Sequence, residues 1–437
     1  MLLSYIFSLH VLPSVIGVTA AAAQVFACHQ AWQWALLYLC AGVGTSNLMF
    51  FISPLPTLSP VGGKYHVGMK EIPRGSGDDD TLPPVTFFYP SRTACAAPQQ
   101  WLPFGDSGYT RGMAAYSGVP AFLLKDMRYV KATVTSDAPC APLFLADGSP
   151  RPLLLFSHGV AGYARLYTAL LLNVAARGAI VAAMAHLDGS GAHCRDATGR
   201  FAVPLDTARP WDADAREPQL KQRIVETQKT MARLQQTGDL LVALGYAPEE
   251  VRRYVALKPK LVLVGHSFGA SAVMATALSP KTEAKDTVAA VVALDPWHVP
   301  LERSLFLEPI EKAQWRYATP SLIVHSETWF VWTEVTEFFD RVTKKILSQK
   351  LTSEEKQRLD DAADKNVRPG ITGEKGWFNI FKWGGIDHLT YTDMSLLSPV
   401  VFKKRYSTRK PIPFLVDLSN QIVRYAEQQL GPVPNKE

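Results

Sequence analysis

The first 63 residues contain no Lys, Arg, Asp or Glu, and the first charged side chain is Lys64. Two apolar runs, residues 2–26 and 31–52, are each long enough to cross a hydrocarbon layer, which takes about 20 helical residues. The missing positive n-region disfavours a signal peptide, and with it secretion after cleavage. We therefore expect residues 1–53 to be an apolar leader with one or two transmembrane segments, which makes the protein membrane-associated.

Cysteine is scarce, and its positions exclude the usual metal-binding spacings. The sequence has five cysteines and no CxxC pair, which excludes a disulfide framework in a chain of this length. It also has no Asn-x-Ser/Thr sequon, which favours a non-lumenal domain. The cysteines are Cys28, Cys40, Cys95, Cys140 and Cys194.

A strong excess of one charge is also absent. The formal net charge is +6 and acidic residues are mixed with basic ones beyond the leader. A modest, interspersed excess is typical of a solvated surface rather than of a nucleic-acid-binding face. We therefore predict no nucleic acid partner.

Apolar runs of strand length alternate with helical patterns in the second part of the chain. Continuous apolar strands separated by helices are typical of a mostly parallel sheet with helices on both faces. We therefore expect an α/β fold over residues 54–437, with an edge strand at residues 85–89 and a charged helical insert at residues 343–368. The strand-length runs are residues 152–156, 179–185, 261–264, 288–294 and 321–324.

Residues 265–269 read Gly-His-Ser-Phe-Gly, directly after one apolar run and directly before an Ala-rich helical pattern. This strand–turn–helix setting is the nucleophile elbow of α/β-hydrolases, in which flanking glycines relieve crowding around an exposed serine. The helix that follows directs its positive end at a developing oxyanion. The motif therefore predicts Ser267 as a nucleophile.

A serine hydroxyl needs a base that takes its proton, and three histidines follow Ser267 in the chain. His298 lies in a loop beyond a strand, and His325 ends a strand run, which is typical of a packed core histidine. His388 follows two glycines in a late loop after the apolar segment 377–383, where α/β-hydrolases carry their base. We predict His388 as the base.

The acid that orients this histidine is less clear from spacing. Asp295 follows the run 288–294 and Glu327 follows the next run, so both carboxylates reach the same edge of the sheet. Asp387 adjoins the histidine but points away from it if the loop is extended. Spacing supports Asp295 and Glu327 equally.

Two backbone N–H groups must hold the oxyanion. One belongs to the residue after the nucleophile, Phe268, and the other to a loop after an early strand. Residues 156–162 form such a loop, and its glycines permit unusual backbone angles, which makes Val160 the second donor. His158 precedes the serine, and we expect it to brace this loop.

Short segments in a fixed order along residues 60–431 resemble one known family. They surround the serine motif, the predicted base and the final helix, at residues 64–68, 88–91, 156–162, 166–167, 180–186, 265–270, 293–297, 326–327, 388, 393 and 417–420. The pattern is similar to that of the platelet-activating-factor acetylhydrolases of plasma and cytosol, which are calcium-independent serine esterases of the phospholipase A2 type.

The resemblance implies an α/β-hydrolase catalytic domain in which Asp295 is the acid beside Ser267 and His388. It assigns the oxyanion donors to Val160 and Phe268. It further implies hydrolysis of the sn-2 ester of phospholipids with short or oxidised acyl chains, at a membrane or lipoprotein surface, with no metal or other cofactor.

Three features depart from the family's pattern: the longer apolar leader, the insert at residues 343–368, and Pro296 directly after the acid. The insert bears on the acyl-chain length that the pocket accepts. Two alternatives remain open, namely a carboxylesterase or long-chain lipase of the same fold, and a catalytically silent, membrane-anchored lipid-binding module.

Overall fold

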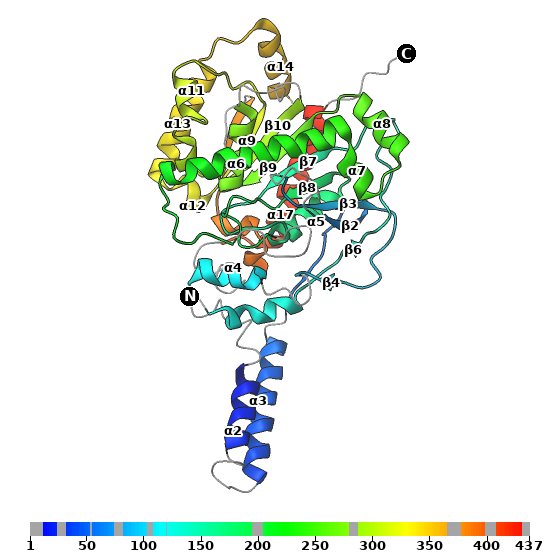
Figure 1. The fold of residues 1–437 in the computed structure, drawn as a ribbon, viewed down its shortest axis with the longest axis vertical. Coiled ribbons are helices and arrows are strands. Elements are labelled where there is room, and N and C mark those ends of the chain that lie inside the picture. The colour runs from blue at the N-terminus through cyan, green and yellow to red at the C-terminus, as the bar shows by residue number, and fades with distance from the viewer. Residues whose placement is uncertain are drawn as a thin grey trace.

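A large mixed sheet forms the centre of the protein, and helices cover both of its faces (Figure 1). The computed structural model describes residues 12–23, 32–52, 55–73, 82–102, 108–118, 120–194, 204–278, 287–364, 377–397 and 408–430.

The strand order of the main sheet is β12-β11-β10-β9-β7-β8-β3-β2-β6. The run from β8 to β12 is parallel, whereas β3 pairs antiparallel with both β2 and β8. The strands are β2 (His66–Ile72), β3 (Val85–Ser91), β6 (Thr135–Ser136), β7 (Leu153–Ser157), β8 (Ile180–Met184), β9 (Leu261–His266), β10 (Val288–Leu294), β11 (Ser321–Ser326) and β12 (Phe378–Trp383). A small second sheet contains β1 (Thr57–Leu58), β5 (Lys131–Ala132) and β4 (Gln99–Gln100).

The helices divide between the two faces of the sheet. Helices α5 and α17 cover one face, and α6 and α9 cover the other (Figure 1). The longer α-helices are α2 (Leu12–Ala22), α3 (Trp32–Ile52), α4 (Gly108–Ser117), α5 (Thr168–Ala176), α6 (Ala213–Ala232), α8 (Pro248–Ala256), α9 (Phe268–Leu278), α13 (Thr333–Leu347), α14 (Ser353–Asp364) and α17 (Pro411–Leu430). Shorter ones are α7 (Asp239–Leu244), α11 (Leu307–Glu311), α12 (Glu327–Phe330) and α15 (Met394–Leu397). The 3₁₀-helices are η3 (Ala121–Tyr129), η4 (Ala164–Tyr167), η6 (Val299–Leu301) and η7 (His388–Tyr391), and η5 (Arg233–Thr237) is a π-helix.

Strand β7 shows why the central strands read as continuous apolar runs. Leu154 and Phe156 belong to the core on the α5 and α17 side, whereas Leu153 and Leu155 belong to the core on the α6 and α9 side. Successive side chains of a strand point to opposite faces, so a strand covered on both sides buries every residue. Because β9, β10 and β11 pair in parallel, their carboxyl ends lie side by side.

The sequence located the parallel strands correctly, to within two residues at their ends. It did not anticipate β2 or the small second sheet. The sequence predicts one helix at residues 217–244, whereas the structure has α6, η5 and α7 there, because Gly238 with a φ of 69° separates η5 from α7. The charged insert begins inside α13 and is not wholly solvated, because its residues Ile346 and Leu359 are buried.

Two N-terminal helices project from the body as an antiparallel hairpin (Figure 1). The two helices, α2 and α3, are in close contact: a Cβ added to Gly17 of α2 would lie 2.4 Å from the carbonyl oxygen of Tyr38 in α3. Helix α2 has 11 residues and is therefore about 16 Å long, short of the about 30 Å of a hydrocarbon core. Among the described residues, no helix combines the length and apolarity that a membrane crossing requires. The transmembrane segment predicted within residues 1–53 is thus not supported.

Candidate active site

The predicted nucleophile lies at a sharp turn between β9 and α9. Ser267 has a φ of 57°, in the left-handed region that a non-glycine residue rarely adopts. A Cβ on Gly265 would lie 2.3 Å from the carbonyl oxygen of Gly269, and a Cβ on Gly269 would lie 2.1 Å from that of Ser157. Both flanking positions therefore require glycine, as the elbow motif predicts.

Ser267 opens onto a cavity of about 310 Å³ whose walls are mostly apolar and aromatic. The cavity also contains the predicted base, His388, and the predicted oxyanion donor, Val160. Its other lining residues are Met113, Tyr116, Ser117, Gly159, Ala161, Leu166, Tyr167, Trp211, His266, Trp297, Trp329, Trp332, Leu389, Thr392 and Met394.

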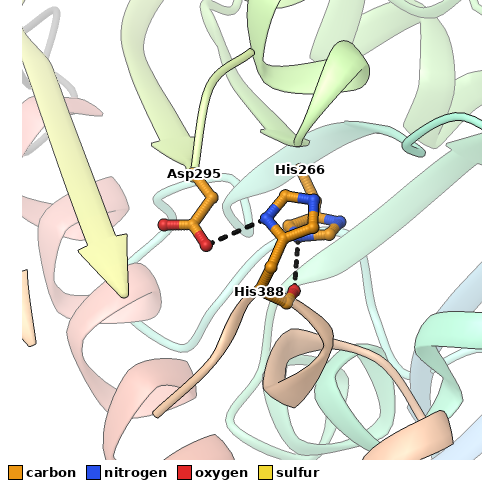
Figure 2. Close-up of side chains that lie close together, drawn as sticks. All are labelled: His266, Asp295 and His388. Carbon is orange, nitrogen blue, oxygen red and sulfur yellow. Dashed lines mark hydrogen bonds and ion pairs between the residues drawn. The ribbon is translucent and has the colours of Figure 1, made fainter. Parts of the chain in front are cut away.

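The structure brings His388 and Asp295 together from η7 and the end of β10. The Nδ1 atom of His388 lies 3.0 Å from Oδ2 of Asp295 (Figure 2). The Asp295 carboxylate is fully buried and accepts hydrogen bonds from the backbone N–H of Ser326 at 2.6 Å and from its hydroxyl at 2.5 Å. These bonds fix the carboxylate, and the carboxylate in turn fixes the ring, which is the arrangement expected if Nε2 of His388 acts as the predicted base.

Trp329, which the sequence analysis did not identify, also contacts the predicted base, His388. The indole of Trp329 stacks on the His388 imidazole with ring centres 4.1 Å apart and an angle of 9°. The indole is anchored in turn, because Trp329 Nε1 donates to the carbonyl of Pro296 at 3.0 Å. A π-face against the ring favours the imidazolium that forms when His388 takes a proton.

The two other carboxylates considered as the acid have different partners. Glu327 Oε2 accepts from the backbone N–H of Gly385 at 2.6 Å. Asp387 caps η7 by accepting from the N–H of Leu389 at 2.8 Å. Of the acids that spacing left open, Asp295 is the one that the fold places against His388.

Residues 52–415 match the family model described as platelet-activating factor acetylhydrolase, isoform II. This chain belongs to that family. Curated relatives agree, because the platelet-activating factor acetylhydrolase of Canis lupus familiaris is 25% identical over 260 residues, and that of Cavia porcellus is 26% identical over 258 residues. Each alignment covers 56% of this chain and 56% of the relative, so the chain spans about half the length of the curated relatives it matches.

A solved structure supports the fold of this family member. The ferulic acid esterase from Streptomyces cinnamoneus superposes with a TM-score of 0.54 over 87% of this chain and 96% of its own. The sequence identity is 16%, so the likeness concerns the α/β-hydrolase fold alone.

The oxyanion loop of this acetylhydrolase-family chain runs from His158 to Gly162. Ala161 has a φ of 55°, and its N–H donates to the carbonyl of Ser190 at 2.7 Å, which fixes the loop beside Val160. Phe268, the other predicted donor, is the first residue of α9 and is fully buried. The first turn of a helix leaves its N–H groups without partners in the helix, so this end suits an anion.

The other histidines discussed in the sequence analysis are His325, His298 and His158, and each is buried and packed within the fold. His325 is buried against Phe339, and burial lowers its pKa to about 4, as expected for a packed core histidine. His298 is 4% exposed and lies beside Trp332, with a lowered pKa caused by burial. His158 donates from Nδ1 to the carbonyl of Gly159 at 2.8 Å, which is the bracing role predicted for it.

A group of three side chains in this site has the residue types of a metal centre. Donor atoms of His266, Asp295 and His388 lie within 4.8 Å of one another. Each ring nitrogen turned toward the group already has a partner, since His388 Nδ1 faces Asp295 and His266 Nε2 faces the His388 carbonyl at 2.9 Å. The arrangement therefore fits a catalytic hydrogen-bond network better than a cation.

Proposed function

We propose that this protein is a serine esterase that hydrolyses the sn-2 ester of phospholipids carrying a short or oxidised acyl chain. The observation that carries the proposal is the shared cavity of Ser267 and His388, with the base held by the buried carboxylate of Asp295. Membership of the acetylhydrolase family supports the same substrate class.

In the acylation step, Oγ of Ser267 attacks the ester carbonyl while Nε2 of His388 takes the hydroxyl proton. The carbonyl oxygen becomes an oxyanion, and the backbone N–H groups of Phe268 and Val160 hold it in this proposal. His388 then gives its proton to the departing alkoxide, and the lysophospholipid leaves as an alcohol. The acyl group remains on Ser267.

In the deacylation step, a water molecule replaces the alcohol. His388 takes a proton from the water as its oxygen attacks the acyl carbon, and the tetrahedral intermediate forms a second time. Collapse of the intermediate returns the proton to Ser267 Oγ and releases a carboxylic acid. Asp295 keeps the same ring orientation in both steps through its 3.0 Å contact with His388.

The size of the cavity supports a short acyl chain. Its volume of about 310 Å³ is at the lower end of the range of about 300–1,000 Å³ that is typical of ligand pockets. Trp211, Trp297, Trp329 and Trp332 form much of its wall, and rigid indoles leave little room for expansion. A long saturated chain would need a second path out of the cavity.

The test is hydrolysis of an sn-2 acetyl ether phospholipid by the full chain in the presence of EDTA. We expect acetate release by the wild type and none by Ser267→Ala. Ser348→Ala is a matched control, because this serine is exposed and its hydroxyl donates to the carbonyl of Lys345. Loss of activity in both variants, or retention in both, would refute the role of Ser267.

Two further measurements separate the alternatives. A fluorophosphonate that labels Ser267 without any acetate release would keep the serine esterase and reject the phospholipid substrate. Faster hydrolysis of a palmitoyl than of an acetyl phosphatidylcholine would identify a long-chain lipase. Failure of both labelling and hydrolysis would favour the catalytically silent module.

A further inference from the structure

Two loops of the site lie far apart in the sequence, namely the oxyanion loop and the loop at residues 384–388 that carries His388, here called the base loop. One hydrogen-bonded connection joins them. Gly159 N–H donates to Oη of Tyr167 at 3.0 Å, and this oxygen lies 2.9 Å from Nδ1 of His266. Nε2 of His266 lies 2.9 Å from the carbonyl oxygen of His388 (Figure 2). The four residues therefore form a continuous chain from the first loop to the second.

The direction of each bond in this chain is determined by its ends. The His388 carbonyl can only accept, so Nε2 of His266 carries the hydrogen. A neutral imidazole then has an acceptor at Nδ1, which receives the Tyr167 hydroxyl hydrogen, and the tyrosine oxygen is left to accept from Gly159. Burial lowers the pKa of His266 well below its usual value and raises that of Tyr167, so both groups keep these forms near neutral pH.

Both ends of the chain lie against reacting groups. A Cβ on Gly159 would lie 3.0 Å from Cβ of Ser267, so this backbone already touches the nucleophile. The ring of His266 lies under that of His388, with centres 4.5 Å apart. A shift of Tyr167 or His266 would therefore move the oxyanion donor at Val160 and the base together.

We propose that Tyr167 and His266 are positioning residues that hold the oxyanion loop and the base loop in register for catalysis. The inference rests on the proposed esterase function, but it concerns two cavity-lining residues to which that function gives no direct part in the proton transfer or in holding the oxyanion. Both side chains are buried, and their hydrogen-bonding atoms are fully used within the chain.

The test uses variants that break one link at a time. Tyr167→Phe removes the hydroxyl. His266→Gln keeps a donor near the position of Nε2 and loses the acceptor at Nδ1, whereas His266→Asn keeps the acceptor and loses the donor. We expect each to lower kcat about 10- to 100-fold with KM unchanged, because misplacement of about 1 Å at a reacting group costs about 100-fold.

The double variant is decisive. Tyr167→Phe combined with His266→Gln should lose no more kcat than either single change, since both break the same link. Tyr317→Phe is the control, because Tyr317 is equally buried and hydrogen-bonded to Ser321 at 2.7 Å but lies outside the cavity. It should leave kcat unchanged.

The rate of fluorophosphonate labelling of Ser267 supplies a readout that does not depend on the phospholipid. Parallel losses in labelling and in kcat, with melting temperatures near that of the wild type, would support the proposal. Additive losses in the double variant, or a loss in KM alone, would overturn it and leave the esterase intact. A wild type that neither labels nor hydrolyses an ester would overturn the proposed function and, with it, this inference.

Discussion

The buried guanidinium of Arg223 forms hydrogen bonds that connect the oxyanion loop to neighbouring loop residues. Its Nε donates to the carboxylate of Asp188 at 2.8 Å, and its terminal nitrogens donate to the carbonyl of His158 and the hydroxyl of Ser190, both at 2.5 Å. The guanidinium also lies over the ring of Phe268, 4.4 Å from its centre. Burial opposes ionisation of Asp188, but the Arg223 charge prevails and lowers the pKa of this carboxyl to about 2.

Arg223→Met should therefore leave an uncompensated buried carboxylate. Both side chains of the pair are fully buried, and removal of one partner from such a pair costs about 3–5 kcal/mol. This is a large share of the about 5–15 kcal/mol that stabilises a typical domain. Urea unfolding followed by fluorescence measures the difference in free energy of unfolding between variant and wild type.

Arg252→Met is the matched control for the same substitution. Arg252 pairs with Glu249 at 3.1 Å, but both side chains are about three-quarters exposed. Solvent screens such a pair, so its loss should change stability by less than about 1 kcal/mol. Equal, small losses in Arg223→Met and Arg252→Met would refute the argument that burial makes the Arg223 pair essential.

Two further predictions concern charge at and behind the site. Asp295→Asn should lower kcat about 10⁴-fold with KM unchanged, because the amide no longer selects the required tautomer of the base. Glu327→Gln should have a small effect on kcat. If steady-state assays give the reverse order, Glu327 and not Asp295 is the acid. Burial, with the charge of Asp188 adding to it, raises the pKa of Glu226 to about 8, and burial lowers the pKa of its partner His186. The folded protein thus keeps the Glu226 proton that the unfolded chain releases near pH 4, so stability should fall as pH rises from about 6.5 to 8. Below about pH 6.5, protonation of His186 in the unfolded chain opposes this trend. Chemical denaturation at several pH values should give a flatter dependence for Glu226→Gln, and an unchanged slope would contradict the assignment.

Local patterns were sufficient to predict the parts of the site that lie close together in the chain. The elbow around Ser267 is contained in five residues, and its glycines are required by contacts within and beside that turn. The apolar runs predicted the parallel strands because a strand buried on both faces has no polar position. The candidate base could also be identified, since His388 follows two glycines in the loop after β12, the strand at the edge of the sheet.

Side-chain direction was not predictable from spacing. Asp295 and Glu327 follow neighbouring strands, and only the fold turns the first toward His388 and the second toward Gly385. The connection from Tyr167 through His266 joins residues far apart in the sequence, and no pattern pairs such positions. The transmembrane prediction for the leader has a different outcome: the run at residues 31–52 does form α3, but no described helix combines the length and apolarity of a membrane span.

Two residues of the site, Ser267 and Asp295, have left-handed backbone conformations, which backbone hydrogen bonds to neighbouring strands hold in place. Ser267 and Asp295 have φ values of 57° and 44°, and such conformations cost about 1–3 kcal/mol each in a non-glycine residue. Each is held by a backbone bond to the neighbouring strand: Ser267 N–H donates to Leu294 at 2.9 Å, and Asp295 N–H donates to Val324 at 2.8 Å. The elbow and the acid turn are thus successive steps of one parallel sheet, each locked by the strand beside it. Because the sheet fixes both backbones before substrate binds, Ser267 and Asp295 would need little rearrangement during the proposed reaction, which is what preorganised catalysis requires.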